Sequence, residues 1–144
     1  MNPIIRKSSV HWKGGARGGT RTVTTESGVI KEAFFSSQKL LKKSAHTDPA
    51  ELVAAALATS FSLALSNELK LRPVAAGMIA TTASVTQDHS IAGWTIKKVH
   101  LNVIAKLPDV TQGTFIDATI RAKTHCLISK LLRANISMNA KLEK

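Results

Sequence analysis

Cysteine is nearly absent from this chain of 144 residues, which contains one, Cys126. A single cysteine excludes a disulfide within the chain and any zinc site built from several cysteines. The histidines show no metal-ligand spacing, so the sequence predicts neither a metal site nor a cofactor. They stand at positions 11, 46, 89, 100 and 125.

Acidic and aromatic residues are also scarce. Nine Asp and Glu stand against 20 Lys and Arg, for a formal net charge of +11, and the chain has no Tyr, two Trp and four Phe. The positive charge is spread along the chain, with one local run at Lys39, Lys42 and Lys43. Neither a helix-turn-helix, a zinc finger nor an aromatic RNA-binding motif is present. We therefore expect no specific nucleic-acid partner, only weak binding that salt disrupts.

Long hydrophobic runs are missing. The longest weakly polar stretch, residues 52–65, is about 14 residues long, whereas a membrane span needs about 20. The first 17 residues are basic and polar, and they lack the apolar segment and cleavage site of a signal peptide. The sequence therefore predicts no transmembrane helix, no membrane partner and a cytoplasmic location.

The length fits a single domain over residues 1–144, and alternating, β-branched segments predict its strands. A first hairpin is expected from residues 8–13 and 21–25 around a glycine-rich loop, with a third strand at 29–35. A second hairpin is expected from residues 78–86 and 94–107, with its turn at 87–90. Residues 135–142 alternate again and predict a closing strand.

Two helices are expected between these strands. Asp48, Pro49 and Glu51 form an N-terminal capping signal, so a long helix should begin there and end near residue 71, before Pro73. Its residues are apolar or small on every side, which predicts burial all round and a second subunit that covers part of it. Residues 114–133 return to helical spacing, with a break at 124–125. The order of elements predicts an α+β fold.

Five short motifs, in order along the chain, carry a resemblance to a known family: His11-Trp12, residues 25–29, Asp48-Pro49 with Glu51-Leu52, residues 60–66, and Cys126 with Ser129-Lys130. Together they resemble the OsmC/Ohr family of peroxiredoxin-like, osmotically inducible and organic-hydroperoxide-resistance proteins. The resemblance covers nearly the whole chain. It implies an intertwined α+β homodimer with antiparallel sheets wrapped around long central helices, and a role in hydroperoxide defence or stress response.

The resemblance also implies a catalytic pattern from which this chain departs. Peroxidases of the family attack the peroxide with one cysteine thiolate and resolve the resulting sulfenic acid with a second cysteine. The resolving position falls on Cys126, but the attacking position falls on Ser60, whose hydroxyl is a poor nucleophile toward peroxide. The resemblance implies that the side chains of Ser60 and Cys126 lie close together at the dimer pocket, although they are 66 positions apart in the sequence. The family's activating Glu falls on Ala50 and its Arg on Leu40, beside Lys39.

Two hypotheses therefore stay open. The first is a peroxidase that uses Cys126 alone, with an external thiol reductant and a hydroperoxide substrate. The second is a non-catalytic homologue that binds a small hydrophobic ligand at the dimer pocket. The residues by themselves also fit a structural role, with Ser60 packing between helices and bonding a carbonyl one turn back, and Cys126 filling the core. His125, adjacent to Cys126, is a weak candidate for lowering the pKa of the thiol.

Overall fold

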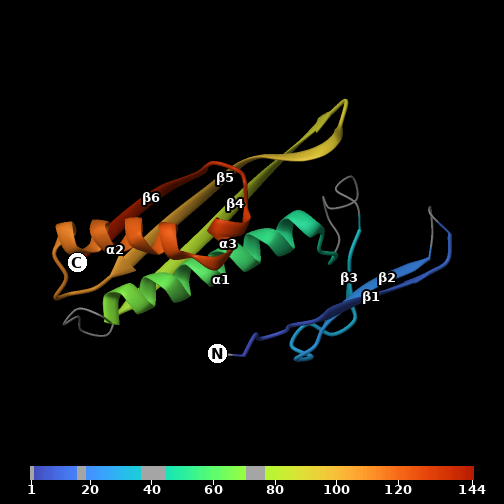
Figure 1. Cartoon of the computed structure of the whole chain (residues 1–144), viewed down its shortest axis with the longest axis horizontal. Helices are drawn as coiled ribbons and strands as arrows, with labels where there is room; N and C mark the ends of the chain where they lie inside the picture. The colour runs from blue at the N-terminus through green and yellow to red at the C-terminus, as the bar shows by residue number, and fades with distance from the viewer. Residues whose placement is uncertain (1, 16–18, 37–44, 71–76) are drawn as a thin grey trace. The chain divides into compact units, whose positions relative to one another are not determined.

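The computed structural model describes residues 2–15, 19–36, 45–70 and 77–144. The chain divides into two compact units, residues 1–49 and 50–144, which are described separately below. A single domain over the whole chain stays a prediction. In chain order the elements are β1 (Ser8–Lys13), β2 (Thr20–Thr25), β3 (Ala33–Phe34), α1 (Pro49–Lys70), β4 (Met78–Ser90), β5 (Gly93–Lys106), α2 (Gln112–His125), α3 (Leu127–Leu131) and β6 (Ile136–Glu143), as Figure 1 shows.

The first unit is an antiparallel sheet in the order β1-β2-β3. The guanidinium of Arg21 lies 4.2 Å from the centroid of the Trp12 ring on the neighbouring strand, a cation–π contact. The predicted hairpin is confirmed, but β3 is much shorter than the predicted strand at 29–35. The chain first turns back on itself, because the backbone N–H of Thr25 donates to the carbonyl of Ile30 at 2.8 Å.

The second unit contains a sheet in the order β4-β5-β6, with β4 antiparallel and β6 parallel to β5. The predicted turn at residues 87–90 is wrong, because these residues pair with β5 and the turn lies at residues 91–92. Gly93 follows with a φ of 96°, a conformation that glycine adopts without steric cost. The Ser90 hydroxyl donates to the Gly93 carbonyl at 3.2 Å and closes the turn.

A β-bulge interrupts the long β4–β5 ladder. Thr86 pairs with Lys98, whereas the next residue on β4, Gln87, pairs with Ile96. Lys97 is therefore the extra residue on β5, without a partner in the ladder. A bulge of this kind redirects side chains and increases the local twist of the strand.

Helix α1 supplies one side of the core of the second unit. Leu57, Phe61, Leu65 and Leu69 recur every four residues and are buried. They belong to one hydrophobic cluster with alternate residues of β5 and with the buried face of α2. Leu63 is 63% exposed in the single chain, so the burial of the helix on every side, with a second subunit covering part of it, stays a prediction.

The 22 residues of α1 extend well beyond the apolar run at 52–65. Among the described residues α1 is the one helix that is long and apolar enough to cross a membrane, judged by length and composition alone. A core helix meets the same criterion, and the buried leucines and phenylalanine of α1 belong to the core cluster.

Helices α2 and α3 are separated by Cys126, close to the break predicted at residues 124–125. The Thr111 hydroxyl caps α2 by accepting from the backbone N–H of Thr114 at 3.2 Å. Cys126 itself has a ψ of 126°, so the backbone leaves helical geometry there and α3 starts in a new direction. The closing strand at residues 135–142 is confirmed as β6.

Candidate functional site

Ser60 and Cys126 meet inside the second unit. The Cys126 Sγ atom lies 3.0 Å from the Ser60 Oγ atom and donates a hydrogen bond to it, although 66 residues separate them in sequence. The contact joins the middle of α1 to the junction of α2 and α3. Cys126 is fully buried and Ser60 is half-buried. The juxtaposition that the family resemblance implied is therefore present; the catalytic roles of the two residues stay predictions.

Local backbone geometry holds the thiol in this position. The Cys126 N–H donates to the carbonyl of Ala122 at 2.8 Å, which ties it to the last turn of α2. The Cys126 carbonyl accepts from the N–H of Lys130 at 3.1 Å, which ties it to α3. Ser60 also accepts from the N–H of Ile128 at 3.4 Å. One hydroxyl on α1 thus contacts both the thiol and the first turn of α3.

Two opposing effects act on the pKa of Cys126. Burial is the largest single effect and raises the pKa, because a thiolate loses its hydration. The hydroxyls of Ser129 and Ser60 and the backbone N–H groups of Ser129 and Ile128 lower it by stabilising the thiolate. The Ser129 hydroxyl is outside standard hydrogen-bond geometry but close enough to contribute. The lowering effects win, so the pKa of Cys126 lies below its ordinary value of 9.0.

His125 does not act on the thiol in the way that its position in the sequence suggested. Its Nδ1 atom lies 3.3 Å from the Glu68 carboxylate, and the Arg121 Nε atom lies 3.4 Å from the other oxygen of the same carboxylate. Glu68 is mostly buried on α1, so this group connects the end of α1 to α2. None of the three lowers the pKa of Cys126, which is lowered by hydrogen bonds alone.

Ala50, the described position at which the resemblance implies a Glu, adds no charged group to the thiol. Ala50 is buried near the start of α1, ten residues before Ser60, so the two positions are about 15 Å apart along the helix axis. Leu40 and Lys39 lie outside the described residues. The Thr59 hydroxyl donates a hydrogen bond at 2.7 Å to the carbonyl of Ala55, one helical turn back. A bond of this kind is the alternative role that the sequence allowed for Ser60. No cluster of three potential metal ligands occurs in the described ranges.

Comparison with known families agrees with this fold and residue order. The model of the family described as OsmC-like protein matches residues 42–141. The chain belongs to the OsmC family. It is 34% identical to the peroxiredoxin OsmC of Escherichia coli K12 over 140 residues, which cover 97% of this chain and 98% of that protein. The same identity and coverage are found for the peroxiredoxin OsmC of Shigella flexneri.

Solved structures confirm the OsmC-like α+β fold of this family member. The OsmC-like protein of Vibrio cholerae superposes with a TM-score of 0.81 at 15% identity, covering 96% of this chain and 100% of that one. The organic hydroperoxide resistance protein OhrB of Bacillus subtilis superposes with a TM-score of 0.68 at 19% identity, covering 97% and 98%. At these identities the likeness concerns the fold.

Proposed function

We propose that this OsmC-family protein is a cytoplasmic stress-response protein that reduces organic hydroperoxides through its single thiol, Cys126. The observation that carries the proposal is the contact between Cys126 Sγ and Ser60 Oγ at 3.0 Å, in a setting that lowers the pKa of the thiol. The names of two relatives support it, since one is a peroxiredoxin and another an organic hydroperoxide resistance protein.

The reaction requires one thiolate and an external reductant. The Cys126 thiolate attacks one peroxide oxygen, the O–O bond breaks, and the departing alkoxide takes a proton to become an alcohol. Cys126 is thereby oxidised to a sulfenic acid. An external thiol attacks that sulfur and releases water to form a mixed disulfide, and a second external thiol restores the Cys126 thiol as the pair of reductants becomes a disulfide.

Ser60 has a positioning role in this scheme. Its hydroxyl remains protonated near neutral pH and does not attack peroxide. It can instead turn its O–H toward the Cys126 sulfur once the thiolate forms, which stabilises the charge. The half-buried Ser60 thus helps to stabilise the thiolate, a role that the family pattern assigns to a Glu and an Arg.

The full burial of Cys126 favours a second candidate function. A thiol with none of its surface exposed reacts with a bulky peroxide only after local opening of the α2–α3 junction. In the second candidate the protein does not turn over peroxide, and a small hydrophobic ligand binds at a pocket between two subunits. The two candidate functions differ in whether the Cys126 sulfur is oxidised by peroxide.

The first test follows that sulfur. The protein is incubated with cumene hydroperoxide and a dithiol while peroxide loss and the mass of the Cys126 peptide are measured. We expect turnover, a sulfenic acid or mixed disulfide on Cys126, and no turnover in Cys126→Ser. The rate should rise with pH as the thiolate forms, with a midpoint below the ordinary cysteine pKa of 9.0, and Ser60→Ala should move that midpoint upward. An unmodified Cys126 without peroxide loss favours the ligand-binding candidate.

We also propose a homodimer of the intertwined family type. Large apolar side chains that are exposed in the single chain support this proposal. They are Leu63 on α1 in the second unit, and Val10 and Trp12 on β1 in the first unit. Burial of such side chains against a second copy contributes about 25 cal/mol per Å² of apolar surface.

The dimer is tested by light scattering at micromolar protein concentration. We expect twice the chain mass of 15.4 kDa, and a shift toward the monomer or loss of folded protein in Leu63→Lys. Ile91→Lys at the β4–β5 turn serves as the matched control and should stay dimeric. A folded protein with the mass of one chain would contradict the proposal.

A further inference from the structure

A positively charged cavity lies in the second unit, lined by residues of α2, α3, β5 and β6. Its volume is about 780 Å³. Four lysines line it: Lys97 and Lys98 from β5, Lys123 from α2 and Lys130 from α3. No carboxylate lines it, and none of the four lysines forms an ion pair with a carboxylate among the described residues. The cavity therefore holds four uncompensated positive charges.

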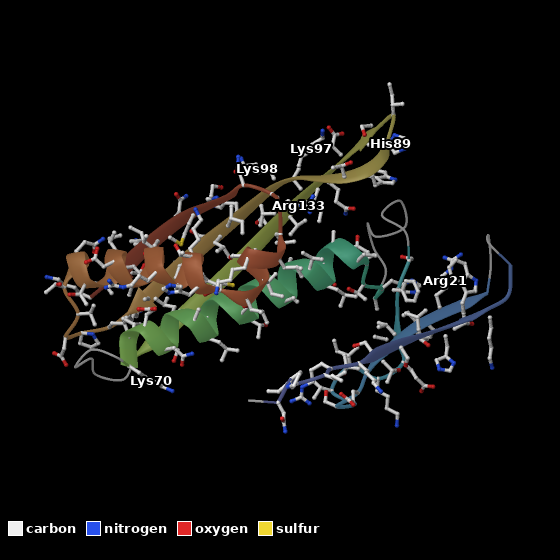
Figure 2. The ribbon with its side chains drawn as sticks, viewed as in Figure 1. Arg21, Lys70, His89, Lys97, Lys98 and Arg133 are labelled. Atoms are coloured by element: carbon white, nitrogen blue, oxygen red, sulfur yellow. The ribbon has the colours of Figure 1, made fainter. Side chains whose placement is uncertain are left out.

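The β-bulge explains how two consecutive residues of one strand reach the same cavity. Successive side chains of a regular strand point to opposite faces of the sheet. The extra residue at Lys97 breaks this alternation, and both Lys97 and Lys98 line the cavity. Figure 2 labels these two side chains on β5. Bulges are over-represented near binding sites, where they redirect side chains.

The rest of the lining combines hydrogen-bonding groups with an apolar wall. Thr124, Asn135 and Ser137 contribute polar side chains to the lining. Ile120, Ile136 and Met138 line the cavity with apolar surface. A ligand that fits both parts carries several negative charges at one end and an organic group at the other.

We propose that this cavity binds a small organic molecule that carries several phosphate groups. Four ammonium groups around one cavity repel each other, and a monovalent anion compensates only one of them. A chain of phosphates offers enough charge and enough acceptor oxygens for all four lysines, while Ile136 and Met138 contact the organic portion. A nucleoside triphosphate is the simplest representative of this class. The proposal does not depend on the reactivity of Cys126.

The test is calorimetric titration of the full-length protein with adenosine triphosphate. A double variant, Lys97→Gln with Lys123→Gln, removes two positive charges from the cavity. The matched control, Lys106→Gln with Lys141→Gln, removes two charges from residues that pair with Glu143 and do not line the cavity. We expect the cavity variant to bind about tenfold more weakly or worse, because charge-assisted hydrogen bonds are lost, and the control to bind like the parent protein.

Further ligands identify what the cavity recognises. Adenosine triphosphate should bind more tightly than adenosine monophosphate and more tightly than tripolyphosphate, and all binding should weaken with salt. Cys126→Ser should bind normally, which separates this proposal from the peroxidase. Equal weakening in both double variants would overturn the proposal in favour of unspecific charge attraction. Tighter binding of a short DNA duplex through the same lysines would overturn it in favour of a nucleic-acid surface.

Discussion

The variant Ser60→Cys is expected to form a disulfide with Cys126 under strong oxidant and to become markedly more stable as a result. The two side chains already approach to 3.0 Å, so only a small movement is needed to form the bond. The bond would close a loop of 66 residues, which in the chain-entropy model stabilises the folded protein by about 4 kcal/mol. Urea unfolding of the oxidised and reduced forms, with peptide mapping, measures this effect.

A neighbouring serine provides the control for this experiment. The Ser62 hydroxyl donates to Thr81 on β4 at 2.9 Å, so a cysteine at position 62 faces the sheet and not Cys126. Ser62→Cys should therefore form no internal disulfide under the same oxidant. If Ser60→Cys also fails to form one, the contact between α1 and the α2–α3 junction is not as described.

We expect the reduced Ser60→Cys protein to turn over peroxide far more slowly than family members that have the complete catalytic pattern. The new thiol has no carboxylate at position 50, and burial keeps its pKa normal or raised. Adding Ala50→Glu should raise the rate. Because positions 50 and 60 are about 15 Å apart on one helix, such a gain would require the proposed dimer to bring position 50 of a second subunit close to position 60. Fast turnover by Ser60→Cys alone would mean that another basic residue, such as Lys39, activates the new thiol.

The variant Phe61→Ala is expected to lower the free energy of unfolding by about 3–5 kcal/mol, since it removes a large, fully buried side chain and leaves a cavity. Phe61 lies on α1 beside Ser60 and belongs to the core cluster with Leu101 of β5 and Phe115 of α2. Urea unfolding followed by circular dichroism measures the change. Ile91→Ala, at a fully exposed turn residue, should stay within about 0.5 kcal/mol of the parent protein. Equal effects of the two substitutions would contradict the packing of α1.

Local signals in the sequence were sufficient to predict the position of the helix that carries Ser60. Asp48-Pro49 and Pro73 bracket α1, and apolar periodicity and a break next to Cys126 located α2 and α3. The pairing of Ser60 with Cys126 was predicted from the family resemblance, because no local rule connects residues so distant in sequence.

The features that the sequence analysis missed depend on tertiary structure. The polar residues at 87–90 look like a turn, but they occupy an exposed strand, and the positive φ of Gly93 places the turn later. Nothing around Lys97 marks a bulge, and nothing around Glu68 indicates its pairing with Arg121 and His125 on α2. These features arise from register and packing, which a pattern within one segment does not contain.

The parallel pairing of β6 with β5 has a consequence for the order of folding. β4 and β5 are joined by a two-residue turn, so they can zip together early. His100 of β5 and Ser137 of β6, which contact each other at 2.6 Å, are 37 residues apart, and α2 and α3 must form the crossover between them first. We therefore expect β6 to dock late. Until β6 docks, one edge of β5 remains unpaired. Partly folded chains at high concentration are therefore expected to aggregate by pairing through that edge.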